Sequence, residues 1–212
     1  MTRAEALKVA KPILFNTEMT LAINNSTKSV TRRVIKDVPN IQDLKPYVIQ
    51  NEPRGYIASN ARVYNFKTPY KVGDILYIRE TFCEYIPDDI IDGVKYAYKA
   101  DTTPSSEEAR KELGYKWKPS IHMPKEAARI FLHVTGVRVE RLQEMKFKDF
   151  IAEGVGLRPE AYNDPDNAYF QAKGQYVTIW NSTIKKSDLD RYGWDANPWV
   201  RVTEFEILEV TE

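Results

Sequence analysis

Apolar residues recur along the chain at the spacings of β-strands and helices. Residues 75–82 and 198–207 alternate between two faces, which is the period of a half-buried strand. Shorter apolar or β-branched runs predict further strands over 12–15, 31–35, 96–100, 129–133 and 137–142. Apolar positions three or four residues apart predict helices over 17–24, 146–155 and 167–180, and a capping box formed by Ser105 and Glu108 begins another. Because strands occur throughout, we expect one α+β domain over residues 1–212, with a mainly antiparallel curved sheet or barrel.

Polar stretches separate these elements. Residues 39–69 contain four prolines and no clear period, so we expect a long insertion with little regular structure. Its aromatic residues argue against disorder; they either cover a site or pack the insertion onto the body. Residues 70–74 predict a turn, and residues 181–197 predict a second polar insertion.

Composition narrows the possible functions. The 212 residues are 42% hydrophobic and 29% charged with a net charge of +1, so a nucleic-acid partner requires a local basic patch. No run approaches the roughly 18 apolar residues of a membrane span, and the polar start is no secretory signal. A single cysteine, Cys83, excludes an internal disulfide and fits a reducing, cytoplasmic setting. Two histidines make a metal site improbable, and no cofactor is expected.

Residues 26–33 form the candidate site. They combine one lysine, four hydroxyl side chains and two arginines in a turn and the start of a strand. Thr31 and Arg33 share one face of that strand, and Lys28 precedes them, so a cation, a hydroxyl and a guanidinium can meet at one place. Arg32 and Arg33 are candidates for binding a polar, planar ligand. The alternative is a solvated basic turn.

Three further stretches carry candidate residues. Glu80 lies on the more apolar face of strand 75–82, either as a site residue or in a salt bridge to an arginine. Prolines 119 and 124 restrict a loop in which Trp117, Ser120 and His122 can bind a base; the alternative is a packed connection. Glu153 ends helix 146–155, where the helix dipole disfavours a carboxylate, so we expect it to face a cation such as Lys28 or to lie on the surface.

The order of these motifs resembles the ASCH domain of the PUA-like superfamily. The resemblance is carried by a helix, the turn Lys28-Ser29-Val30-Thr31-Arg32-Arg33, Val72-Gly73-Asp74 before a strand, residues 137–142 leading into the helix that ends Ala152-Glu153-Gly154, and the final strand. It covers about half of the chain. Relative to the small ASCH core, residues 39–69, 84–119 and 156–197 are insertions, as in the longer ASCH proteins of phages and prophages.

The resemblance implies a catalytic set. A small ASCH amidohydrolase removes the acetyl group of N4-acetylcytidine with a lysine, a threonine three residues later and a downstream glutamate, which correspond here to Lys28, Thr31 and Glu153. A threonine hydroxyl needs an adjacent base, and a desolvated lysine can supply one. Glu153 then orients the lysine or relays the proton, and Arg33 holds the base or the oxyanion.

Other functions stay open at this point. The same basic cleft in ASCH relatives binds RNA or cleaves it, so the chain is either an amidohydrolase, a ribonuclease, or a non-catalytic module for RNA, single-stranded DNA or a modified base. A phage factor that binds a host protein is a further alternative. The expected partner is a modified nucleoside or nucleotide or a single-stranded nucleic acid, and no membrane partner is expected. The expected location is the cytoplasm, which is that of the host if a phage encodes the chain.

Overall fold

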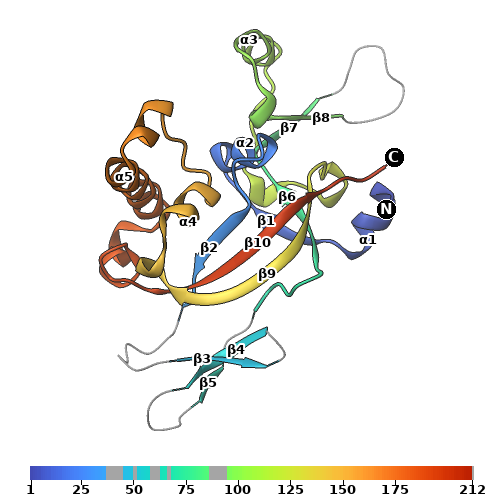
Figure 1. Ribbon diagram of the computed structural model, residues 1–212. Helices are drawn as coiled ribbons and strands as arrows, with labels where there is room; N and C mark the ends of the chain where they lie inside the picture. The colour runs from blue at the N-terminus through green and yellow to red at the C-terminus, as the bar shows by residue number, and fades with distance from the viewer. Residues whose placement is uncertain (37–44, 50–51, 58–62, 66–67, 86–94, 212) are drawn as a thin grey trace. The chain divides into compact units, whose positions relative to one another are not determined.

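A computed structural model describes residues 1–36, 45–49, 52–57, 63–65, 68–85 and 95–211 (Figure 1). Their contacts divide the chain into two compact units. Unit 1 comprises residues 1–25, 74–133 and 207–212, and unit 2 comprises residues 26–73 and 134–206. Helices and strands occur in both units, which confirms the α+β class.

Unit 1 contains three neighbouring strands. β6 (Ile75–Arg79) pairs in parallel with β1 (Lys11–Leu14) and antiparallel with the start of β9 (Phe131–Arg141), so the sheet is mixed rather than antiparallel throughout. The turn before β6 is present as predicted, with Gly73 at a φ of 87° that favours glycine. β7 (Phe82–Tyr85) and β8 (Lys95–Tyr98) form a separate antiparallel pair.

The helices of unit 1 begin at side-chain caps. The expected helix α2 (Thr17–Asn24) starts where Asn16 Oδ1 accepts a hydrogen bond from Met19 N at 2.8 Å. α3 (Pro104–Glu112) starts at Thr103, not at the predicted Ser105, because a proline at the first helical position moves the cap upstream. α1 (Arg3–Val9) was not predicted; it begins with a capping box formed by Thr2 and Glu5.

Unit 2 is built on two antiparallel strands and the helices beside them. β10 (Trp199–Leu208), the predicted terminal strand, lies between β9 and β2 (Val30–Val34) and pairs antiparallel with β2. The expected helices are α4 (Phe147–Ala152) and α5 (Pro165–Thr183), which contact each other (Figure 1). Five of the strands named so far have the order β1-β6-β9-β10-β2 in one sheet. Within the described residues this sheet does not close into a barrel, because its edge strands β1 and β2 each pair with a single neighbour.

One expectation about unit 2 is wrong, and a second segment holds more structure than its sequence indicated. The interval 39–69 holds regular structure, because β3 (Lys45–Ile49), β4 (Glu52–Ile57) and β5 (Val63–Asn65) form an antiparallel sheet despite the prolines. The predicted insertion 181–197 contains α6 (Leu189–Tyr192) and contributes the buried Trp194 to the core.

A further expectation, about β9, is also wrong. Residues 131–141 form one continuous strand, where two strands separated at Gly136 were predicted. Gly136 is no turn residue: a Cβ added there would lie 2.5 Å from Glu204 Oε2 on β10. The glycine therefore admits the side chain of a neighbouring strand, a role that local sequence does not distinguish from a turn.

Phe150 is at the centre of the core of unit 2. Its ring lies 5.5 Å from that of Tyr176, 5.9 Å from that of Tyr169 and 6.2 Å from that of Trp194. Trp180 packs in the same cluster and donates a hydrogen bond from Nε1 to Tyr192 O at 2.9 Å. Aromatic packing thus connects α4, α5 and Trp194, the Trp180 hydrogen bond joins α5 to α6, and together they hold the helix whose C-cap is Glu153.

Replacing Phe150 with alanine should lower the free energy of unfolding by about 3–5 kcal/mol, because it leaves a cavity among the three aromatic rings that Phe150 contacts. Urea denaturation measures the change. Phe170→Ala on α5 is the matched control: that side chain is 67% exposed, and its loss should cost much less. Equal costs for the two variants would contradict this description of the core.

Candidate functional site

The turn that carries Lys28 is held by its own backbone. Ser26 has a φ of 56°, in the left-handed region that turns the chain sharply after α2. Ser29 N donates to Ala152 O at the end of α4, and Ser29 O accepts from Phe205 N on β10, both at 2.9 Å. An isolated β-bridge joins Lys28 to Glu153. The candidate turn and the end of α4 are therefore fixed together within unit 2.

Glu153 faces Lys28. Glu153 is the C-cap of α4. The Lys28 amine donates to Glu153 Oε2 at 2.5 Å and to Glu153 O at 2.9 Å. The amine thereby neutralises the carboxylate and satisfies a carbonyl at the helix end, which is where a cation is favoured. This is the contact that the sequence led us to expect for Glu153.

The pair is enclosed by protein. The Lys28 side chain is 1% exposed and that of Glu153 is 6% exposed. Burial lowers the pKa of Lys28 from its ordinary value, and the neighbouring Glu153 carboxylate opposes that change. A lysine under these two influences is a candidate base, since its neutral form is less costly here than in water.

Arg32 contacts the same carboxylate from the other side. Its guanidinium is 0% exposed and lies 3.1 Å from Glu153 Oε1, 2.8 Å from Glu140 Oε1 and 3.2 Å from Asp149 Oδ1. Arg138 on β9 extends the network, because it contacts Glu140 at 2.8 Å and also pairs with Glu204. The predicted ligand-binding Arg32 thus has its partners inside the protein.

Thr31 and Arg33 lie on the other face of β2. Strand side chains alternate, so both point away from the side on which Arg32 meets Glu153. Thr31 is buried and stands opposite Thr203 of β10, whereas Arg33 is exposed. The structure brings Lys28 and Glu153 together, but among the residues it describes no hydrogen bond joins Thr31 to either of them.

Glu80 belongs to a different ion pair, in unit 1. Its buried carboxylate accepts two hydrogen bonds from Arg129, at 2.9 and 3.1 Å, and Arg129 also pairs with Asp101. Burial raises the pKa of Glu80, and Arg129 opposes the rise. The structure therefore shows the salt bridge that was one of the two interpretations of this residue.

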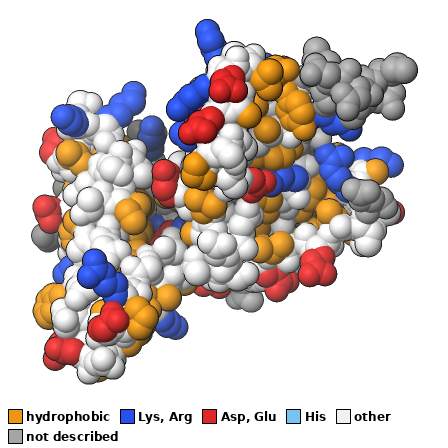
Figure 2. Space-filling view, turned by 90° about the horizontal axis from the view of Figure 1, so that it is seen from above, with side chains coloured by type: hydrophobic (Ala, Val, Ile, Leu, Met, Phe, Trp, Pro, Cys, Tyr) orange, Lys and Arg blue, Asp and Glu red, His pale blue; other side chains and the backbone are white. Residues whose placement is uncertain are grey.

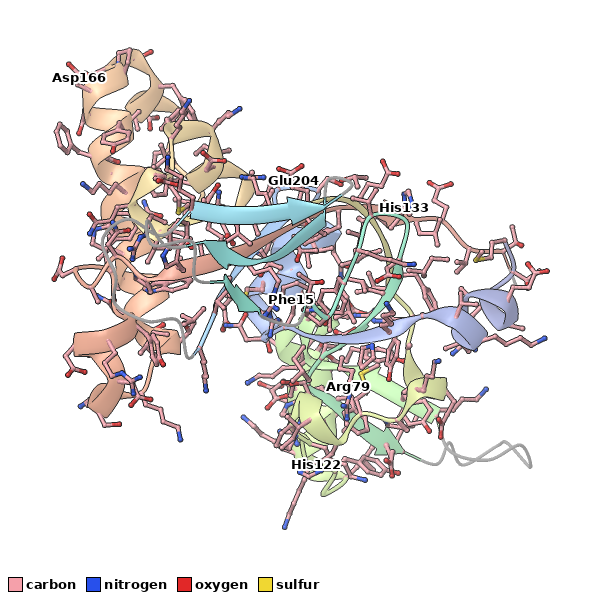
Figure 3. The ribbon with its side chains drawn as sticks, turned by 90° about the horizontal axis from the view of Figure 1, so that it is seen from below. Phe15, Arg79, His122, His133, Asp166 and Glu204 are labelled. Atoms are coloured by element: carbon pink, nitrogen blue, oxygen red, sulfur yellow. The ribbon has the colours of Figure 1, made fainter. Side chains whose placement is uncertain are left out.

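In the loop from Trp117 to Pro124, some of the candidate side chains contact other residues of unit 1. Trp117 Nε1 donates to Glu107 Oε2 at 3.1 Å, and the Arg110 guanidinium lies 5.0 Å from its ring centre. Ser120 and His122 form a single 3₁₀ turn, in which His122 is exposed (Figure 3). Trp117 thus has a packing role, while His122 presents its ring to solvent.

Sequence reasoning missed Glu140, Asp149 and Arg138. A signal was available, because Arg138 and Glu140 alternate with valines in a strand and so share one face. Asp149 gave no such signal, because an acidic residue in the first turn of a helix is ordinary. It accepts a hydrogen bond from Lys146 N at 2.8 Å at the start of α4. Only the packing of α4 on the strands brings these side chains to Arg32.

No metal centre stands out in the described part of the chain, and one face of it carries charges of both signs. It contains no group of three or more His, Cys, Asp or Glu side chains placed to hold a metal ion. None of its helices has the length and hydropathy needed to span a membrane. The face seen in Figure 2 carries acidic and basic side chains close together, in keeping with the net charge of +1.

Comparison with known proteins adds no relative. No family model, no curated protein and no solved structure matches the chain.

The lowered pKa of Lys28 predicts a pH-dependent contribution to stability. The folded protein loses this proton at a lower pH than the unfolded chain, whose lysine has a pKa of 10.5. Between those two values the unfolded state binds more protons, so the free energy of unfolding should rise with pH, by at most about 1.4 kcal/mol per pH unit. Urea denaturation at several pH values measures the slope.

Lys28→Met should remove this part of the slope, whereas Lys148→Met, at an exposed position on α4, should leave it intact. Comparing the variants cancels the contributions of other groups, such as Tyr98, whose pKa burial raises to about 12. Identical slopes for wild type and Lys28→Met would show that Lys28 keeps an ordinary pKa.

Proposed function

We propose that the chain is an ASCH-type protein of the PUA-like superfamily that hydrolyses an amide-type bond on a modified nucleoside or nucleotide, such as an N4-acylcytidine. The observation that carries the proposal is the contact between Lys28 and Glu153. The buried Lys28 amine, whose pKa is lowered, meets a carboxylate that lies 125 positions away in the chain. Lys28 also lies three residues before a buried threonine, Thr31. These are the residue types that the ASCH resemblance requires at these places.

The order of elements supports the same family. A helix, α2, precedes the Lys28 turn and β2, the Val72-Gly73 turn precedes β6, and β9 leads through a short 3₁₀ turn into α4, whose C-cap is Glu153. β10 completes the order. We propose that this open mixed sheet is an elaborated form of the small PUA-like barrel, with β3 to β5 and the segments around α3, α5 and α6 as additions.

The chemistry would proceed in two steps. The Thr31 hydroxyl attacks the acyl carbon while neutral Lys28 takes the hydroxyl proton. The Lys28 ammonium then gives a proton to the departing amino group of the nucleobase. Water hydrolyses the resulting threonine ester and releases the carboxylic acid. Glu153 orients the amine, and exposed Arg33 stabilises the oxyanion. Thr31 lies on the face of β2 that points away from Glu153, so this mechanism requires the turn before β2 to rearrange when substrate binds and bring Thr31 to Lys28.

Incubation with N4-acetylcytidine and related acylated nucleosides tests the proposal, with chromatography detecting the free nucleoside and the acid. Lys28→Met and Thr31→Ala should each lower kcat at least about a hundredfold. Thr178→Ala, an exposed threonine on α5, should retain the wild-type rate. Absence of turnover at high enzyme concentration would refute the enzyme proposal, and an undiminished rate in Thr31→Ala would exclude Thr31 as nucleophile.

The enclosure of the Lys28–Glu153 pair favours a second candidate, a binding module without chemistry. With side chains 1% and 6% exposed, the pair would then only fix the turn, and exposed groups of unit 2 such as Arg33 would contact a single-stranded nucleic acid. This candidate requires affinity for single-stranded RNA or DNA that falls as salt rises, with no product formed. Cleavage of the RNA would instead indicate a ribonuclease.

A further inference from the structure

Arg32 occupies an unusual position for an arginine beside a candidate site. It makes contacts below 3.3 Å with three carboxylates, those of Glu140, Asp149 and Glu153, and its side chain is inaccessible to solvent. That guanidinium is engaged by carboxylates inside the protein. Because it always carries its charge, it is a permanent partner for Glu153, unlike the lysine on the other oxygen.

The two carboxylates behind Arg32 are fixed from the rim of unit 2. Arg138 Nε lies 2.8 Å from Glu140 Oε2, and Arg138 Nη2 lies 3.5 Å from Asp149 Oδ1. Arg138 also pairs with Glu204, whose side chain passes over Gly136. Four carboxylates and two guanidiniums thus form a connected frame that ends at Glu153, whose other oxygen faces Lys28.

Lys28 is the single amine in this frame. The charged groups that act on it are Glu153, which favours its protonated form, and Arg32 and Arg33, which disfavour it. Glu153 divides its two oxygens between Lys28 and Arg32. Each cation therefore weakens the hold of the carboxylate on the other, and only the lysine can respond by losing a proton.

We propose that Arg32 is a positioning residue, which engages Oε1 of Glu153 and so leaves the Lys28 amine able to release and regain its proton inside the protein. The inference rests on the proposed function, since it names what prepares the base of that reaction. Arg32 acts through Glu153 and touches no substrate. Glu140 and Asp149 tune its effect, because they neutralise part of its charge.

Direct titration of Lys28 tests this role without any substrate. The protein is labelled with ¹³Cε-lysine, and Lys28→Met identifies the Lys28 signal in the NMR spectrum. Arg32→Met should raise the pKa of Lys28 by about one unit or more, since Glu153 then serves the lysine alone. Glu140→Gln should lower the pKa of Lys28, because Arg32 loses a counter-charge and acts more strongly on Glu153.

The opposite directions separate positioning from mere structural support. A purely structural role would change stability in both variants and move the Lys28 titration in neither. If Arg32→Met fails to fold because Glu140 and Asp149 lose their partner, Glu140→Gln decides the question. Arg158→Met, which removes an exposed guanidinium, is the matched control and should leave the titration unchanged.

The proposal is overturned if the pKa of Lys28 is the same in Glu140→Gln as in the control Arg158→Met. It is also overturned if Glu140→Gln raises the pKa of Lys28. Its failure is distinguishable from failure of the proposed function. Shifted titrations without turnover of any acylated nucleoside would retain Arg32 as the positioning residue and reject the hydrolase. Turnover with an unresponsive Lys28 would retain the hydrolase and reject the role of Arg32.

Discussion

The carboxylate of Glu153, shared between Lys28 and Arg32, is the interaction on which unit 2 depends. It connects the turn before β2, the strand itself and the end of α4, three segments that are separate in the chain. An ionised carboxylate buried here without partners would cost several kcal/mol, so the three elements have to meet in one arrangement. The backbone bond from Ser29 N to Ala152 O and the aromatic packing around Phe150 hold the same arrangement from outside the network.

Burial and pairing act against each other at this site, and the outcome differs between its two cations. Arg32 stays charged under any conditions in which the protein folds, so its cost of desolvation is offset by three carboxylates. Lys28 has one carboxylate and can instead give up its proton. The same neighbourhood thus holds one cation whose charge is fixed and one whose pKa burial lowers.

Unit 1 contains a second buried charge pair, which differs from that of unit 2 in the chemistry of its cation. Glu80 and Arg129 form a two-point salt bridge, and Arg129 lies 4.0 Å from the ring centre of Tyr98. Both partners there are fully engaged, and the guanidinium cannot lose its proton. The difference from unit 2 is the lysine, which makes the Lys28–Glu153 contact the better candidate for function.

Local sequence determined the α+β class, the positions of most helices and strands, and the expectation that Glu153 faces a cation, because these follow from periodicity, caps and the helix dipole. It did not determine that Arg32 points inward while Thr31 lies on the opposite face of β2, or that Gly136 admits Glu204 rather than turning the chain. Nor did it indicate the strands of residues 45–65, where prolines suggested irregular structure. Those features were decided by tertiary structure alone, since the partners of a buried charge, the neighbour of a glycine and the pairing of short strands are set by segments distant in the chain.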